Sequence, residues 1–420
     1  MRTNFTPSQL ADPHLAEAER SLRTCVHCGI CTATCPTYVL LGDERDGPRG
    51  RIVMIQHMLE ENAAPTPETV LHIDRCLSCL ACRTACPSSV DYARLVDTAR
   101  VHIQTRYRRP IGDRWLRWLI AKVMTRPALV RAGLALAPLG RVLPGRLGAM
   151  ARMGAKAKHR AHSEPPPKIA VARRRIALMP GCVQAVLAPG IDEAMARVLA
   201  RRDIALVPLA GAGCCGSLVH HLGRSEEAKS FARRAIQAFE ASGCDGVLIT
   251  ATGCSAHLKD LAHLFADEPA WAPRAASFAA KALDPLELVE ARGTVPRRLR
   301  VAWQAPCSLQ NGPRNGPRNG LKLADRGRKL LAGCGYDVLD IPEGHLCCGS
   351  AGSYSILQPE LADALRARKL GNIAGLAPDI VATANIGCLH HLSGPGAPPV
   401  VHWAELVDRA DGGAELPCSE

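Results

Sequence analysis

The chain has 420 residues, 47% of them hydrophobic, which is enough to bury the cores of two or three domains. Its 19 cysteines are far more than an ordinary globular protein carries, and the first twenty residues lack the apolar core of a signal peptide. We therefore expect a cytoplasmic protein whose clustered cysteines serve metal or redox chemistry rather than a disulfide framework. The formal net charge is +13, and one segment accounts for this excess.

Residues 1–108 are the first predicted domain and contain two matching runs of cysteines. CVHCGICTATCP at 25–36 and CLSCLACRTACP at 76–87 each space four cysteines by two, two and three residues and end on a proline. Short helical patterns such as RGRIVMIQHMLEEN lie between them, so this domain should be mainly helical. The spacing C-x2-C-x2-C lets one tight loop bring three thiolates to one iron-sulfur cube.

The fourth ligand of each cube is expected to come from the other run, as in two-cluster ferredoxins. Structural zinc is the alternative, but zinc favours two separated C-x2-C pairs over four cysteines within eleven residues. His27, inside the first run, is expected at the surface or as a hydrogen-bond donor near a cluster. The predicted ligands are Cys25, Cys28, Cys31 and Cys86 for one [4Fe-4S] cluster, and Cys76, Cys79, Cys82 and Cys35 for the other.

Residues 109–170 form a predicted basic connector. Residues 101–175 contain 18 Lys or Arg against two acidic residues, a local net charge of 18 minus 2, or +16. Trp115 and Trp118 lie among these arginines, a mixture that suits the headgroup layer of an anionic membrane. The alternative is a solvated basic helix with its apolar face packed on its own protein. Arginines break every apolar run before it is long enough to span a bilayer.

From residue 171 onward, strand and helix patterns alternate in two similar copies, 171–296 and 297–420. RIALMPG, IALVPLAG and GVLITATG in the first copy correspond to LRVAWQAP, YDVLDIP and DIVATANIG in the second. Strands alternating with helices predict parallel sheets with chemistry at the strand C-terminal ends. The predicted fold is a multidomain α+β protein, in which a helical ferredoxin-like domain with two [4Fe-4S] clusters precedes two repeated α/β Cys-Cys-Gly domains.

Each α/β copy carries a matching set of four cysteines, and in each set the adjacent pair is followed by glycine. Three sulfur-bearing loops in each copy should therefore converge. Burial as small apolar side chains is the alternative, which we accept for Cys244, Cys334 and Cys418. The candidate cofactor-binding residues are Cys182, Cys214, Cys215 and Cys254 in the first copy, and Cys307, Cys347, Cys348 and Cys388 in the second.

GAGCCG at 211–216 matches the dinucleotide motif G-x-G-x-x-G after an apolar strand. That motif also needs a helix opening directly on the last glycine and an acidic residue about 20 positions later. SLVHHLG follows here, and the second copy, HLCCGSAG, lacks the pattern. We interpret the match as chance and expect no flavin on this chain.

These features together resemble the iron-sulfur subunits of glycolate oxidase, also called glycolate dehydrogenase, over nearly the whole chain. The resemblance is carried by the two cysteine runs, by TYVLLGDERDGPRGRI after the first run, by HLCCGSAGSYSILQPELA at 345–362 and by TANIGCLHHL at 383–392. It implies a non-catalytic electron-transfer subunit of an oxidoreductase complex. Flavin-bearing partner subunits would oxidise glycolate and D-lactate, and the clusters would pass electrons towards a membrane quinone.

This resemblance also implies a peripheral location on the cytoplasmic face of the inner membrane. The alternative is the electron-transfer subunit of another flavoenzyme complex, of the anaerobic glycerol-3-phosphate dehydrogenase, lactate-utilisation or heterodisulfide reductase type. A nucleic-acid partner is not expected, because the basic segment lacks a docking motif and aromatic residues are only 4% of the chain.

The chain departs from the heterodisulfide reductase relatives at the end of each Cys-Cys-Gly set. In those relatives a closing C-x-x-C helps hold a non-cubane iron-sulfur cluster, so the resemblance implies a further iron-sulfur cluster as the candidate occupant of these sites. This chain has Cys254-Ser-Ala-His257 and Cys388-Leu-His-His391 instead. One thiolate is therefore missing from each set. Either His257 or His391 replaces it as a nitrogen ligand, or the thiols are structural.

Overall fold

Prolines begin five of the short helices that build the N-terminal domain. A proline at the first helical position loses no hydrogen bond, because that N–H has no partner within the helix. The computed structural model describes residues 1–140, 165–312, 316–413 and 416. The first helices are α1 (Pro7–Leu10), α2 (Pro13–Thr24), η1 (Ile30–Thr32), α3 (Pro36–Leu41), η2 (Glu44–Asp46), α4 (Pro48–Glu61), α5 (Pro67–Asp74), α6 (Ala81–Ala85) and α7 (Tyr92–Arg106).

Helices α8 (Ile111–Val123) and α9 (Pro127–Gly140) are the described part of the basic connector. Helix α8 packs Leu116 and Ile120 into the core of the first α/β domain. Its other face leaves Trp115 and Trp118 about half exposed, at 55% and 47%. The connector therefore has an apolar face packed on its own protein and also presents aromatic side chains among its arginines. Residues 141–164 of the predicted connector lie outside the described residues.

The first α/β domain is a four-stranded parallel sheet of order β2-β1-β3-β4 with helices around it. Strand β3 is buried throughout, as expected for a continuous apolar run within a parallel sheet. The elements are β1 (Arg174–Leu178), α11 (Gln184–Leu187), α12 (Gly190–Ala200), β2 (Ile204–Pro208), α13 (Ser217–His221), α14 (Ser225–Ser242), β3 (Gly246–Leu248), α15 (Thr252–Lys259), α16 (Leu261–Leu264), α17 (Ala272–Lys281), β4 (Ala282–Leu283) and η3 (Pro285–Glu287).

The second α/β domain repeats this topology with the parallel order β6-β5-β7-β8. The predicted repeat is therefore confirmed strand by strand. Its elements are β5 (Arg300–Gln304), α18 (Cys307–Asn311), α19 (Gly316–Gly333), β6 (Asp337–Asp340), α20 (Tyr354–Leu357), α21 (Pro359–Ala374), β7 (Ile380–Thr383), α22 (Ile386–Leu392), β8 (Val400–His402) and α23 (Trp403–Ala410).

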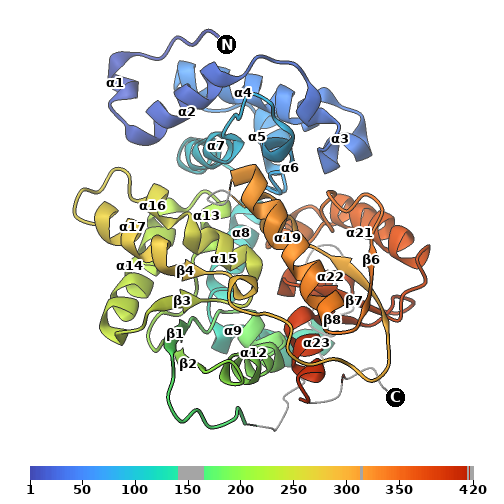
Figure 1. Cartoon of the computed structure of the whole chain (residues 1–420). Helices are drawn as coiled ribbons and strands as arrows, with labels where there is room; N and C mark the ends of the chain where they lie inside the picture. The colour runs from blue at the N-terminus through green and yellow to red at the C-terminus, as the bar shows by residue number, and fades with distance from the viewer. Residues whose placement is uncertain (141–164, 313–315, 414–415, 417–420) are drawn as a thin grey trace.

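The two α/β domains share a core. Ile176 and Leu248 of the first sheet belong to the same buried cluster as Val301 and Ala382 of the second. A buried ion pair also joins α12 to α23, with Arg197 Nη2 2.7 Å from Asp408 Oδ2. Figure 1 shows the N-terminal domain (blue) at one end of the molecule, above the first α/β domain (green to yellow) and the second (orange to red).

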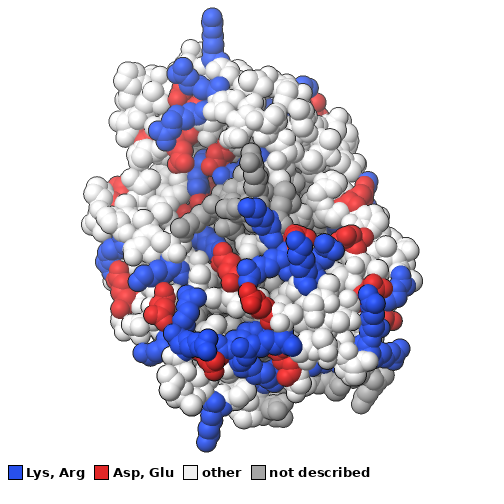
Figure 2. Space-filling view, viewed as in Figure 1, with Lys and Arg blue, Asp and Glu red and all other residues white. Residues whose placement is uncertain are grey.

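The predicted fold class is confirmed, with a helical N-terminal domain followed by two repeated parallel α/β domains. Basic and acidic side chains are interleaved over the face seen in Figure 2, and the most continuous basic run lies in its lower half. Within the described residues, no helix combines the length and the apolar character needed to cross a bilayer.

Candidate metal centres

The two cysteine loops of the N-terminal domain share one backbone conformation. His27 and Gly29 in the first loop have φ values of 56° and 80°, and Ser78 and Leu80 in the second have 53° and 58°. These left-handed residues occupy the same positions relative to the cysteines. Left-handed residues in such a turn can point backbone N–H groups towards one centre, which suits an anionic cluster. The repeat in cysteine spacing therefore extends to the shape of the loops.

Cys86 from the second run approaches the first loop, because α6 packs against η1. This corner of the domain is at the surface, with Cys28 exposed and with Val26 and Ile30 exposed by 69% and 54%. The side chain of His27 is half-buried there. One small cavity of about 30 Å³ is bordered by Cys25, Cys28, Cys31, Cys82 and Cys86. The four ligands predicted for the first cluster thus face a common space.

The second loop is buried against the second α/β domain. Leu77 and Cys79 pack in one apolar cluster with Cys347 and Cys388. Burial raises the pKa of the Cys79 thiol well above its ordinary value, and that of Cys82 as well. A thiolate at this depth needs a compensating positive charge, and bound iron would provide it.

Cys35, the predicted fourth ligand at this second site, is held by polar neighbours. Its sulfur lies 3.3 Å from the Thr37 hydroxyl and 3.8 Å from Nη1 of Arg51. Arg51 is almost fully buried and also donates to the backbone carbonyl of His72 at 2.8 Å. In the second loop, the Tyr92 hydroxyl lies 3.8 Å from the sulfur of Cys76.

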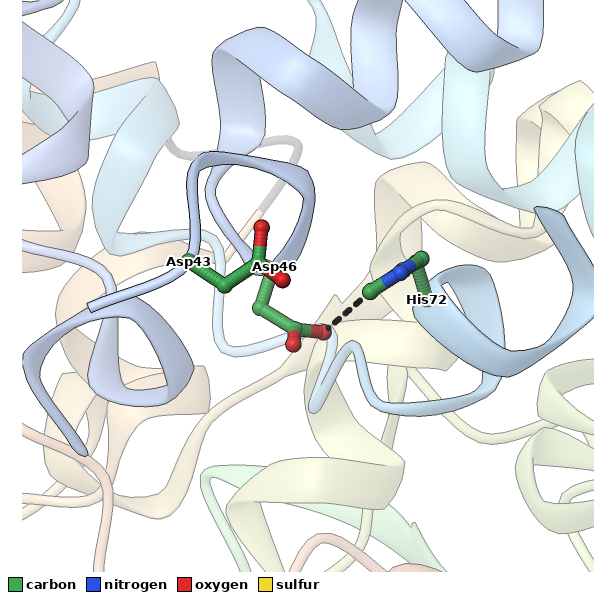
Figure 3. Close-up of side chains that lie close together, drawn as sticks. All are labelled: Asp43, Asp46 and His72. Atoms are coloured by element: carbon green, nitrogen blue, oxygen red, sulfur yellow. Dashed lines mark hydrogen bonds and ion pairs between the residues drawn. The ribbon is translucent and has the colours of Figure 1, made fainter. Parts of the chain in front are cut away.

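Asp46, which is fully buried, neutralises the positive charges around this site. Its carboxylate lies 3.0 Å from His72 Nδ1, 2.8 Å from Arg75 and 3.4 Å from Arg51. Figure 3 shows Asp46 and His72 facing one another, with Asp43 alongside. These three residues have the donor types of a metal site, but the cationic partners of Asp46 already balance its charge. We take the group as the support of the Cys35 loop.

The tract GDERDGPRG, on which the sequence resemblance partly rests, forms this support. It folds into η2 and the first turn of α4. Gly50 is packed so closely that an added Cβ would lie 2.3 Å from the carbonyl oxygen of Glu44. Sequence reasoning quoted this tract but did not assign Arg51 or Asp46 a role. Their separation from Cys35 by 16 and 11 residues gave no periodic signal.

The thiols of the first Cys-Cys-Gly set lie together after the strands β1, β2 and β3. The sulfurs of Cys182 and Cys214 are 3.5 Å apart, and the Gly216 N–H donates to the Cys214 sulfur at 3.4 Å. Hydrogen bonds with Cys182 and Cys215 lower the pKa of Cys214. Cys215 in turn hydrogen-bonds with Cys254. All four predicted residues of this set are therefore brought together.

The second set repeats the arrangement after β5, β6 and β7. The Cys307 and Cys347 sulfurs are 3.9 Å apart, and those of Cys348 and Cys388 are 3.3 Å apart. The Gly349 N–H donates to the Cys347 sulfur at 3.5 Å, as its counterpart does in the first set. The predicted second set is thus also gathered at one sheet edge.

Glycine after each cysteine pair is required by conformation and by space. Gly216 and Gly349 have φ values of 86° and 94°, in the left-handed region that disfavours other residues. A Cβ on Gly216 would lie 3.2 Å from Cβ of Phe231, and one on Gly349 would lie 2.5 Å from the carbonyl oxygen of Ala362. The shared Cys-Cys-Gly sequence therefore reflects a shared tight turn over a helix.

His257 and His391, which stand where each set lacks a thiolate, differ in their hydrogen bonding. In the described part of the chain, the buried Nε2 of His257 has no hydrogen-bond partner. Burial lowers the pKa of His257 to about 4, so its imidazole is neutral at pH 7 and free to act as a ligand. Nε2 of His391 instead lies 3.2 Å from the carbonyl oxygen of Ala362. A nitrogen ligand at Nε2 thus fits the first set and not the second.

A second histidine near the first set was not anticipated from the sequence. Nε2 of His220, on α13, lies 3.2 Å from Oδ2 of Asp97, on α7. One turn further along α7, Arg100 donates to the carbonyl of Cys76 at 2.7 Å. The N-terminal domain and the first α/β domain therefore meet through this His220–Asp97 pair. The two residues are 123 positions apart in the sequence, so no local pattern indicated their contact.

Both Cys-Cys-Gly sets open into one cavity of about 870 Å³ where the three domains meet. The N-terminal domain contributes Cys76 and Cys79 to its lining, and α8 and α9 contribute apolar side chains. All eight cysteines of the two sets border it: Cys182, Cys214, Cys215, Cys254, Cys307, Cys347, Cys348 and Cys388. The two predicted sites therefore face a single cavity.

The stretch GAGCCG corrects one sequence expectation. Helix α13 begins at Ser217, directly after Gly216, although the sequence predicted no helix there. The helix has only five residues, and the motif's glycines shape the loop that carries Cys214 and Cys215. This loop therefore serves the cysteine site.

The fold and its cysteine sites define an iron-sulfur protein with a ferredoxin-like domain and paired cysteine-rich domains. Residues 24–90 match the 4Fe-4S dicluster domain, and residues 176–259 and 301–393 match the Cysteine-rich domain. A crystal structure of a hypothetical protein from Helicobacter pylori shares the fold, with a TM-score of 0.55 and 9% identity over 96% of this chain and 73% of that chain.

Two relatives indicate the family to which this iron-sulfur protein belongs. The chain is 38% identical to the glycolate oxidase iron-sulfur subunit of Escherichia coli (strain K12), over 98% of this chain and 99% of the relative. It is 25% identical to lactate utilization protein A of an Exiguobacterium species, over 56% of this chain and 97% of the relative. The chain belongs to the family of glycolate oxidase iron-sulfur subunits.

Proposed function

We propose that this chain is the electron-transfer subunit of a glycolate-oxidising complex and has no catalytic residue for the carbon substrate. The observation that carries the proposal is the pairing of two identical cysteine loops, one at the surface and one against an internal cavity. Flavin-bearing partner subunits would oxidise glycolate, and D-lactate, to the 2-oxo acid. The electrons would then reach a quinone at the membrane.

The cysteines of the two loops are suitable ligands for electron-transfer clusters. Soft thiolates select iron-sulfur clusters, and such clusters supply one-electron transfer steps when bound. We assign Cys25, Cys28, Cys31 and Cys86 to one [4Fe-4S] cluster, because they border one small cavity. Cys82 also borders that cavity, but the spacing of its loop places it with Cys76, Cys79 and Cys35 at the other cluster.

The difference in exposure between the two cysteine loops indicates the direction of electron transfer. Cys28 is exposed and lies between the exposed side chains of Val26 and Ile30, so a partner can approach this loop closely. Cys76 and Cys79 are buried and line the large cavity. Electrons therefore enter at the first loop and leave through the second.

The Cys-Cys-Gly sets extend the relay. Each set gathers four thiols at a strand-end edge, and His257 adds a nitrogen donor to the first. We infer that they hold at least one further iron-sulfur cluster. Cys79 and Cys347 pack in one apolar cluster, so the second set lies next along the path.

Peripheral contact with a membrane is proposed for α8 and α9. Ile111, Trp115 and Trp118 are exposed at positions i, i+4 and i+7 on one side of α8. Arg114 and Arg131 are exposed and make no ion pair among the described residues, so they remain available to anionic headgroups. Aromatic and basic side chains together suit the headgroup layer of the inner membrane's cytoplasmic face.

Reconstitution tests the proposed function. Coexpression of this chain with the flavoprotein partners should give glycolate-dependent reduction of an artificial dye that neither component shows alone. Full dye reduction by the partners without this chain would overturn the proposal.

Lactate is the second candidate substrate, favoured by the likeness to lactate utilization protein A. The flavoprotein selects the substrate, so the same complex can be assayed with glycolate, D-lactate and L-lactate. A preference for L-lactate in the reconstituted complex would favour this candidate over glycolate.

A further inference from the structure

The cavity between the three domains has an apolar wall that no cysteine chemistry explains. Helices α8 and α9 line it with Leu119, Val123, Val130 and Leu134. A volume of about 870 Å³ lies in the range of cofactor and ligand sites, which are mostly apolar with a few polar groups. The thiols occupy the sheet edges, whereas this wall faces them from the connector.

The same two helices carry the surface proposed to meet the membrane. Trp115 and Trp118 are exposed, while Leu119 and Val123 of the same helix line the cavity. On α9, Leu136 is 62% exposed and also borders the cavity. The apolar wall is therefore continuous with the exposed apolar stripe, and a lipid-soluble molecule has a path from one to the other.

The polar end of the cavity has groups suited to a carbonyl that gains electrons and protons. His220 and His257 line it, and in the described residues Nδ1 of His220 is buried without a hydrogen-bond partner. Nε2 of His220 lies 3.2 Å from Oδ2 of Asp97, which fixes the orientation of the imidazole ring. The other charged or titratable groups around His220 are Arg100 on α7, His221 on α13, His257 on α15 and Asp260 at the start of α16.

We propose that this cavity binds a lipid quinone, with the ring near Cys79 and the apolar tail along α8 and α9. Reduction to the quinol takes two electrons and two protons, and each carbonyl oxygen becomes a hydroxyl. The electrons arrive singly through the cluster sites at 25–86, so the inference rests on the proposed function. Both protons come from solvent.

Binding of decylubiquinone, a short-chain quinone, tests the proposal directly. Calorimetry on the cluster-loaded full chain in detergent should show one site per chain. Gly133 on α9 lines the cavity, and an added Cβ there would meet nothing within 4 Å. Gly133→Phe should therefore fold normally, retain its EPR signals and bind decylubiquinone about tenfold more weakly, or worse.

Gly112→Phe is the matched control, since Gly112 on α8 also has open space around it and does not line the cavity. Its affinity for decylubiquinone should equal that of the wild type. Equal binding by Gly133→Phe and the wild type, or no binding by the wild type, would overturn the inference. A wild-type complex without glycolate-dependent dye reduction would instead show that the proposed function has failed.

A photoreactive azidoquinone gives a second measurement that does not depend on a variant. Crosslinks to the wild-type chain should map to peptides from α8, α9 and α13. Labelling confined to other peptides would overturn the site.

Discussion

Nη1 of Arg51 lies 3.8 Å from the sulfur of Cys35, and both side chains are buried. This places a guanidinium, paired with the buried Asp46 carboxylate, beside a predicted cluster ligand. The guanidinium also donates to the His72 carbonyl and to the Thr37 hydroxyl. A fixed charge at this depth is weakly screened, so it should affect the energy of adding an electron nearby.

Arg51→Leu should lower the reduction potential of the cluster next to Cys35, because the added electron loses a favourable charge interaction. The expected shift is on the order of 100 mV at an effective dielectric constant of about 20. The measurement is an EPR-monitored redox titration of the purified chain. Arg51→Lys, which keeps the charge, should shift the potential much less. Equal shifts in the two variants would show that packing, and not charge, sets the effect.

Because the fourth ligand of each cluster is assigned to the other cysteine run, we predict that the cysteine variants fall into two pairs. Cys86→Ala and Cys28→Ala should alter the EPR signal of one cluster, and Cys35→Ala and Cys79→Ala should alter that of the other. Each cluster loses one of its four thiolates. The assignment would be wrong if Cys86→Ala perturbed the same signal as Cys79→Ala.

Val26 and Ile30 should form part of the surface that receives the electron-donating partner. A double substitution, Val26→Glu with Ile30→Glu, should weaken association by about tenfold or more by placing charge in a close apolar contact. Copurification and the dependence of dye reduction on partner concentration measure this effect. Val171→Glu, at a side chain 81% exposed in another domain, is the control. Unchanged association in the double variant, with intact clusters, would place the partner elsewhere.

Trp115 and Trp118 should anchor the chain to anionic vesicles together with the neighbouring arginines. Wild-type protein should pellet with such vesicles and be released by high salt, because screening weakens the headgroup attraction. Trp115→Ser with Trp118→Ser should reduce the bound fraction at low salt. Equal recovery with neutral and anionic vesicles would contradict an electrostatic anchor.

The cysteine spacing was sufficient to predict the helical two-cluster domain, and the duplicated strand pattern was sufficient to predict two parallel α/β domains. Both signals are local, since three ligands lie in one loop and each strand is a short apolar run. The strand-end positions of Cys182 and Cys307 followed from the same pattern. The glycines that follow the two cysteine pairs, Gly216 and Gly349, both have left-handed φ values and close neighbours.

The rest depends on how domains pack, and domain packing leaves no short-range pattern. Nothing in the sequence placed His220 against Asp97, or both cysteine sets around one cavity. The short helix α13 was missed because a five-residue segment carries no clear periodicity. Residues 141–164 of the predicted connector lie outside the described residues.

The central claim is that thiolates 25–86 hold iron-sulfur clusters that relay electrons for a partner enzyme. Anaerobic iron and sulfide analysis with EPR on the purified full chain tests this most directly. We expect at least eight irons and eight sulfides per chain, with about twelve or more irons if the Cys-Cys-Gly sets also hold a cluster. A folded, iron-free chain that binds zinc and still supports glycolate-dependent turnover would contradict the claim.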